Sequence, residues 1–433
     1  MRVSPRKWAS NVVRSIKHQS VSIGLDTAAT SATNAAVLLI GARELPASQF
    51  TPLAMFQLLV ATCVALQRAT ILNPALAAQR SLARPAAVPK RWAIYVSIPA
   101  GLLVATAFPL LLGQRAHFVQ VLALSANGVI ALLIQDVLRY SHYSRSTAHL
   151  ALIADGMWAL SFIVAVLLLF SGTSWVEMAS IWTVTAWISV AISLFMAAPW
   201  RKRRNDRIPL RRTMHLGKWS GLDNALSAFA NLLPMLATSL VVASPLAGTY
   251  RLMQTVIGPL NVVNSTMVAS IGKSSWRLTS SDQIDSLQKR AYRLAATVAV
   301  ATVAYLVIAF PLVALFTGVE SDALPRVIAV YAFSALCGAL GAPLMSSALA
   351  LGYQYVGLVI RVLVVAVSVT ATSLAVAGIW VPFGDPIGTV AVLSSAFNLT
   401  GWTYGFSRAT KRERGKYLVA ETAKPPNLLR KEQ

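Results

Sequence analysis

The sequence contains few charged residues. Only 12% of its 433 residues are Asp, Glu, Lys or Arg, and 56% are hydrophobic. A soluble domain averages about 25% charged residues. The mean hydropathy of +0.61 agrees with this composition. An ordinary soluble domain is therefore excluded, and the composition indicates a membrane protein with many spans.

The residues that bind metals and perform covalent catalysis are scarce. The two cysteines, Cys63 and Cys337, both lie in apolar runs, and the five histidines lie near connections or tails. This excludes a disulfide framework and a His/Cys metal site. No phosphate-binding glycine loop and no nucleophile next to a base is found. We therefore expect no enzyme, no catalytic residue and no cofactor or metal, and we expect any transport to use an ion gradient or the substrate's own gradient.

Long polar connections are also missing. Apolar segments of roughly 20 residues, enough to cross a bilayer, follow one another with connections of 20 residues or fewer. No connection can hold a soluble domain of about 50 residues or more. The first segment lacks a cleavage site and is expected to be a span rather than a signal peptide. The twelve expected spans are 20–41, 51–72, 92–113, 117–138, 149–171, 175–199, 219–243, 245–271, 292–317, 326–350, 355–379 and 386–407.

Acidic residues are outnumbered by basic ones, 15 to 38, and the position of the basic residues explains the excess. Of the 38, 33 lie in the two tails and the even-numbered connections, where we count Arg68 and Arg139, and three lie on the opposite side. Such an asymmetry is the positive-inside pattern of membrane proteins. We expect both termini to be cytoplasmic, the basic tails to contact membrane lipids, and nucleic acid not to be a partner.

The chain contains an internal repeat. At an offset of 197 residues, Gly24, Leu25 and Asp26 fall on Gly221, Leu222 and Asp223. Asn34 also falls on Asn231, and Gln57 on Gln254. An even number of spans in each half makes the repeats parallel. The expected fold is all-α: 12 transmembrane helices in two parallel-repeat six-helix bundles around a central cavity. Its parts are an N-terminal half (1–200), a basic linker (201–218), a C-terminal half (219–408) and a basic tail (409–433).

Two stretches carry a resemblance to a family. They are Ala47 to Arg80 and Ser244 to Lys273, the second with Gly248, Tyr250 and Arg251. With the two six-span halves, they resemble the polysaccharide transporters of the MATE-like (multidrug/oligosaccharidyl-lipid/polysaccharide) flippase superfamily; Thr51 departs from the pattern, which usually has glycine. The resemblance implies a bacterial plasma-membrane protein that moves an isoprenoid-linked sugar. Its implied partners are a lipid-linked glycan and envelope polysaccharide assembly proteins.

Three acids inside the expected spans lie close to their cytoplasmic ends. Asp26, Asp155 and Asp223 each lie one or two turns from the cytoplasmic end, and Arg361 lies at a similar depth. A charge in a bilayer is costly and usually faces a protein interior or a wet cavity. We interpret the acids as a gate or as ion-coupling sites. The alternative is that they are helix-end charges near the positive end of the helix dipole.

Other polar residues are candidates for binding substrate. Arg251 and Arg361 are the only cations expected well inside the spans, and arginine grips phosphate with paired hydrogen bonds. Snorkelling of these long side chains to the interface is the alternative. Amides and aromatic rings bind sugars, but the same amides also form bonds between helices. The candidates of this kind are Asn34, Gln57, Asn231, Tyr250 and Gln254.

Two other functions compete with export of a lipid-linked sugar. A MATE-type drug or organic-cation antiporter would need an acidic cavity, whereas the spans here carry two arginines against three acids near one edge, which favours an anionic substrate. A membrane sugar polymerase or ligase would need a large outer loop with catalytic groups, and the outer connections are about ten residues or shorter. A scaffold role in an envelope assembly complex also remains open.

Overall fold

The computed structural model describes most of the chain. The described residues are 5–75, 118–145, 147–172, 174–197, 210–237, 246–258, 281–317, 324–351, 353–379 and 386–422, with short pieces between 95 and 106 and Leu260. In these ranges every regular element is a helix. Most of the span expected at 92–113 and the second part of the span expected at 245–271 lie outside the described residues.

Eight of the described helices are long and apolar enough to cross a membrane. The protein is thus a multi-pass membrane protein with an all-helical fold, and the expected twelve-span layout is compatible with it. The expected spans 219–243 and 386–407 overlap helices that fall outside these eight. The eight segments are Val21–Glu44, Ala47–Ala75, Phe118–Tyr143, Ala148–Leu169, Trp175–Met196, Asp282–Pro311, Leu324–Leu349 and Tyr355–Val376.

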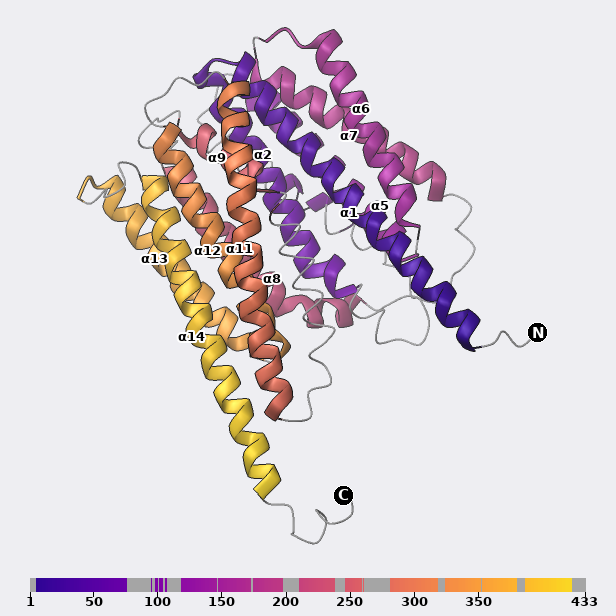
Figure 1. The fold of residues 1–433 in the computed structure, drawn as a ribbon. Coiled ribbons are helices and arrows are strands. Elements are labelled where there is room, and N and C mark those ends of the chain that lie inside the picture. Colours follow the sequence, from indigo (N-terminus) through magenta and orange to yellow (C-terminus); the bar gives the residue numbers. More distant parts are fainter. Residues whose placement is uncertain are drawn as a thin grey trace. The chain divides into compact units, whose positions relative to one another are not determined.

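Contacts divide the chain into two compact units. The first unit is Met1–Val256 with Val313–Ser321, and the second is Ile257–Leu312 with Asp322–Gln433. The described helices of the first unit are α1 (Pro5–Glu44), α2 (Ala47–Gln67), the π-helical turn η1 (Arg68–Leu72), α5 (Phe118–Tyr143), α6 (Ala148–Leu169), α7 (Trp175–Ala197), α8 (Leu210–Ala237) and α9 (Leu246–Val256) (Figure 1).

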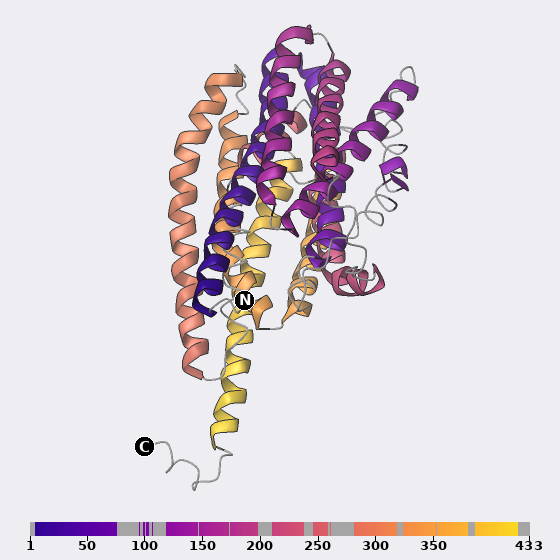
Figure 2. The same ribbon diagram turned by 90° about the vertical axis from the view of Figure 1, so that its right-hand side faces the viewer.

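Helix α2 is the centre of the first unit. It contacts α1, α5, α7, α8 and α9, while α6 packs against α1 and α7 (Figures 1 and 2). Its long apolar run suits this position, since a helix that is apolar on every side is normally buried. At its end the regular helix widens into η1, a rare geometry that often marks a functional site.

Glycines allow α8 and α9 to approach α2 closely. A Cβ on Gly221 of α8 would collide with the Thr70 side chain in η1, and a Cβ on Gly248 of α9 would lie 2.8 Å from Phe50 of α2. A side chain at either point would force the neighbouring side chain or helix to shift. Gly248 belongs to the second stretch that carries the family resemblance, so packing explains its presence there.

The second unit contains α11 (Ser281–Thr317, whose last turn is grouped with the first unit), α12 (Leu324–Ala350), α13 (Gln354–Val376) and α14 (Pro386–Thr422). Helix α14 packs along α12 and α13. Close to its end, α14 is joined to α11 by an Arg414–Asp285 ion pair and by the Tyr292 and Phe406 rings, whose centroids are 6.0 Å apart. Because α14 ends at Thr422, the basic tail expected from residue 409 is helical as far as that residue.

Candidate functional site

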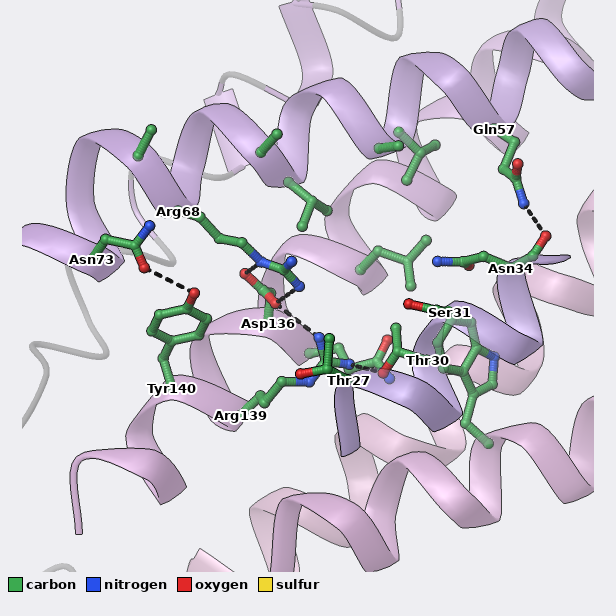
Figure 3. A pocket seen from close by; sticks show the side chains of 18 of the residues that line it. Thr27, Thr30, Ser31, Asn34, Gln57, Arg68, Asn73, Asp136, Arg139 and Tyr140 are labelled. Atoms are coloured by element: carbon green, nitrogen blue, oxygen red, sulfur yellow. Dashed lines mark hydrogen bonds and ion pairs between the residues drawn. The ribbon is translucent and has the colours of Figure 1, made fainter. Parts of the chain in front are cut away.

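Five charged side chains meet inside the first unit. They come from α1 (Asp26), η1 (Arg68), α5 (Asp136 and Arg139) and α6 (Asp155), and we call them the charge cluster. Asp136 and Arg139 are three residues apart on α5, a spacing that puts both on one face of the helix. Figure 3 shows Arg68, Asp136 and Arg139 facing one another.

Arg139 lies at the centre of the charge cluster and contacts all three of its acids. Its Nε lies 2.7 Å from Asp155 Oδ2 and 3.2 Å from Asp26 Oδ2, and its Nη1 donates to Asp136 Oδ1 at 3.0 Å. Its Nη2 contacts Asp155 and also donates to Thr30 Oγ1 at 2.9 Å. One guanidinium thus serves three carboxylates, which its five fixed N–H donors make possible.

Arg68 provides a second cation on the open side of the cluster. It holds Asp136 with two parallel bonds, Nε to Oδ2 at 2.8 Å and Nη2 to Oδ1 at 2.5 Å. Its side chain is 34% exposed, against 2% for Asp136. The guanidinium also lies over the Tyr140 ring, 6.0 Å from its centroid, and Tyr140 donates to Asn73 Oδ1 at 2.9 Å. The π-helical turn therefore presents Arg68 to both α5 and the solvent-accessible side.

Neutral groups donate further hydrogen bonds to Asp155 and Asp26. Asp155 Oδ1 accepts from Gln135 Nε2 at 2.7 Å and from Ser189 Oγ at 2.8 Å. The Tyr143 hydroxyl donates to Asp26 Oδ2. Asp26 and Asp155 are 0% and 2% exposed, so their charges depend on these contacts. No group of three or more His, Cys, Asp or Glu suited to a metal ion is found in the described part of the chain.

A cavity of about 350 Å³ adjoins the charge cluster. Its charged lining consists of Arg68, Arg139, Arg251 and Asp136, whereas Asp26 and Asp155 lie behind the wall. The polar face of α1 forms one side: Thr27, Thr30, Ser31 and Asn34 recur at helical spacing and point toward the cavity in Figure 3. The surface that a bound molecule meets is thus basic and rich in hydroxyl and amide groups.

Aromatic rings and further amides form the rest of the lining. Trp158 and Trp182 both line the cavity, and Trp158 Nε1 donates to the Trp182 carbonyl at 3.3 Å. Phe56 packs edge-on against Trp182 with ring centroids 5.9 Å apart, which fixes the indole. Gln57 Nε2 donates to the Asn34 carbonyl at 2.6 Å and ties α2 to α1.

Asp26 and Asp155, expected from the sequence as a gate or ion site, do come together. Their helix-end interpretation is wrong for Asp26, because α1 begins at Pro5 and places Asp26 in mid-helix. Asp223 is likewise well inside α8, which begins at Leu210. The dipole effect is confined to the first turn. Asp223 is half-buried and stands outside the charge cluster, although its neighbour Asn224 lines the cavity.

The substrate candidates are distributed unevenly. Arg251 is 9% exposed, lines the cavity, and donates from Nη1 to Gln254 Oε1 at 2.7 Å. Asn34 and Gln57 also line it. Tyr250 is fully buried and Asn231 is exposed, and both are absent from the lining. Arg361 is half-buried on α13 in the second unit.

The expectation that Arg251 and Arg361 are the only cations inside the spans is wrong. Arg68 and Arg139 lie within the apolar segments Ala47–Ala75 and Phe118–Tyr143. Their positions near span ends place both with the cytoplasmic connections when hydropathy alone is used. The spacing of Asp136 and Arg139, one helical turn apart, was the sequence signal that could have identified them and Asp136 as a buried pair.

Comparisons with known proteins agree on the fold. No protein-family model matches the sequence, and no curated protein does. Among solved structures, an outward-facing multidrug resistance MATE family transporter of the MOP superfamily matches with a TM-score of 0.60 and 13% identity, over 92% of this chain and 96% of that one. MATE in complex with MaL6 matches with a TM-score of 0.55 and 16% identity, over 92% and 95%.

A third solved structure is a MOP superfamily transporter from Pyrococcus furiosus, for which the reverse polarity of its binding pocket suggests a different function. It matches with a TM-score of 0.52 and 16% identity, over 92% of this chain and 95% of that one. Identities this low establish the fold alone. The chain therefore has the fold of MATE transporters of the MOP superfamily.

Proposed function

We propose that this protein is a membrane transporter that works by alternating access and moves an isoprenoid-linked oligosaccharide or polysaccharide precursor across the bacterial plasma membrane. The transporter part of the proposal is supported by the fold, which transporters of the MOP superfamily share. The substrate part rests on one observation, the lining of the cavity in the first unit. Three arginines and one aspartate face that cavity.

A basic lining favours an anionic substrate. The head of a lipid-linked sugar carries phosphate, which arginine binds with paired, charge-assisted hydrogen bonds. Arg251 lines this cavity with its Nη1 on the neutral Gln254, and it is the phosphate candidate of the sequence that the cavity contains. Arg361 remains a second candidate from the sequence. A cationic drug would meet these guanidinium groups first, and like charges repel.

The uncharged lining suits a sugar. Hydroxyl and amide groups can exchange hydrogen bonds with sugar hydroxyls, and flat indoles can stack on sugar rings. Thr27, Ser31, Asn34 and Asn224 supply the first kind of group, and the indole of Trp158, which is buried in the wall of the cavity, is the candidate for the second. We propose this cavity as the site that holds the sugar head. The competing function is a MATE-type drug or organic-cation antiporter, which the multidrug transporters among the solved structures favour.

The charge cluster is our candidate for ion coupling. It holds three carboxylates against two guanidinium groups, so one negative charge is left over when all are ionised. A proton or a sodium ion taken up by Asp26 and Asp155 would balance it. Release of that cation would strengthen the attraction between Arg139 and the acids, and thereby change the packing of α1 against α5 and α6.

A strain lacking the gene tests the substrate. We expect lipid-linked sugars to accumulate on the inner leaflet and the surface glycan to be lost. Arg251→Ala should lower the rate of export roughly ten- to hundredfold, the loss of about one charged hydrogen-bonding group. The matched control is Arg43→Ala on α1, because Arg43 is exposed and outside the cavity. A normal glycan together with drug hypersensitivity would instead support the antiporter.

A further inference from the structure

The second unit contains a groove that is separate from the polar cavity. It has a volume of about 410 Å³ and is formed by one face of α13 and one face of α14. The wall from α13 includes Val356, Val359, Ile360 and Leu363, which recur at helical spacing. Nearly all of the groove's surface is apolar.

The wall from α14 changes character along its length. Phe397, Thr400 and Tyr404 line the apolar part, and Arg408 and Arg412 line the end, all on one face of the helix. Gly401 and Gly405 let α13 come close here, since a Cβ on Gly405 would lie 2.7 Å from Val356 Cγ1. The groove is thus apolar along most of its length and has the positive charges of Arg408 and Arg412 at one end.

The surroundings of the basic end leave it positive. Arg408 Nη1 lies 3.5 Å from the neutral Tyr404 hydroxyl. The nearby acid, Glu413, is already engaged: it accepts from Tyr353 Oη at 3.0 Å and pairs with Lys416 Nζ at 2.6 Å. In the described part of the chain, neither Arg408 nor Arg412 is in an ion pair.

The dimensions match one leaflet of a bilayer. Phe397 and Arg408 are separated by roughly 16 Å along α14, at 1.5 Å per residue. Half of the hydrocarbon core of a bilayer is about 15 Å. Two tyrosines at the basic end, Tyr355 and Tyr404, are of the type that gathers at the membrane interface. The positive-inside pattern puts this end at the cytoplasmic leaflet, which is the anionic one.

We propose that this groove binds an anionic phospholipid of the cytoplasmic leaflet, with its phosphate on Arg408 and Arg412 and one acyl chain along α13 and α14. The bound lipid would stabilise the packing of α13 against α14. The proposal needs only the membrane location and is independent of the transported substrate.

Native mass spectrometry of the full chain in detergent, titrated with phosphatidylglycerol or phosphatidylcholine, tests the headgroup. We expect phosphatidylglycerol to bind at least tenfold more tightly than phosphatidylcholine, and the double variant Arg408→Ala/Arg412→Ala to lose that preference. The charge-matched control is Lys289→Ala/Lys411→Ala, whose exposed lysines lie outside the groove lining. Equal losses in both double variants, or equal binding of the two lipids, would overturn the proposal.

A second pair of variants tests the acyl chain. Val359 lines the groove and Val362, on the same helix, does not; they are 54% and 50% exposed. Val359→Trp should fill the groove and weaken phosphatidylglycerol binding about tenfold, whereas Val362→Trp should leave it unchanged. Gel filtration and thermal unfolding without added lipid verify that every variant is folded. Unaltered lipid binding by Val359→Trp would refute the acyl-chain position.

Discussion

Arg139 is the residue on which the first unit depends most directly. It is 5% exposed and contacts three buried carboxylates, so Arg139→Ala would leave Asp26 and Asp155 without a cation. Breaking a buried ion pair costs about 3–5 kcal/mol. We expect a large drop in the thermal unfolding temperature of the purified protein. Arg68→Ala serves as the comparison and should cost less, because Arg68 is partly exposed and holds only Asp136.

Arg139→Lys separates charge from shape at the same position. A lysine keeps the positive charge but lacks the planar fork of donors. We expect partial recovery of stability, measured in the same unfolding experiment. If Arg139→Ala and Arg68→Ala had the same unfolding temperature, the central role of Arg139 in the charge cluster would be refuted.

Asp26→Asn tests the ion coupling proposed for the charge cluster. Asn keeps the shape of Asp and can accept from Tyr143, and Oδ1 of Asp26 has no hydrogen-bond partner among the described residues. The variant also removes the surplus negative charge. We therefore expect a folded protein whose transport no longer responds to the ion gradient, measured in proteoliposomes.

Asp223→Asn is the matched control for Asp26→Asn. Asp223 is the repeat-related acid and lies outside the charge cluster. We expect its transport to keep the ion response. An ion response in Asp26→Asn equal to that of the unmodified protein would remove Asp26 from the coupling mechanism.

At the scale of helices, hydropathy predicts where the chain is buried better than where a helix ends. The spans expected at 149–171, 175–199 and 355–379 agree with α6, α7 and α13 to within three residues at either end. Helices α1 and α14 extend well into the basic tails, because hydropathy measures burial in a membrane whereas helix formation also tolerates basic residues.

The same distinction explains what was missed in the site. The expected span 117–138 ends one residue before Arg139, which places Arg139 in a connection. Its partners Asp26 and Asp155 were identified, because acids inside apolar runs are conspicuous. The packing of α1 and α6 against α5 brings Asp26 and Asp155 to the Arg139 guanidinium. This contact and the π-helical turn that positions Arg68 both depend on tertiary packing.

The close packing of α8 on η1 gives a test at the helix scale. A methyl group at Gly221 would collide with Thr70, so Gly221→Ala should separate α8 from η1 and lower the unfolding temperature. Gly24→Ala on α1 is the matched control, since nothing lies within 4 Å of its Cβ position. There the gain in helix propensity, up to about 1 kcal/mol, should leave stability equal or higher. Equal unfolding temperatures for both variants would contradict this packing.

At the scale of the whole molecule, the distribution of basic residues predicts the topology. If both termini are cytoplasmic, as this distribution predicts, we expect a C-terminal green fluorescent protein fusion to be fluorescent and a C-terminal alkaline phosphatase fusion to be inactive. The same phosphatase inserted at Gly172, between α6 and α7, should be active because this connection is expected to face outward. The reverse pattern of activities would show that the orientation is inverted.

The charge cluster also has a consequence for biosynthesis. Tyr143 follows Asp26 by 117 residues, and Arg139 is made only slightly earlier. At about 5–20 residues per second, Asp26 waits roughly 6–23 seconds for these partners. During that interval α1 would carry an acid without its partners, and a charge inside a bilayer is costly. We therefore expect α1 to stay near the translocon until α5 emerges.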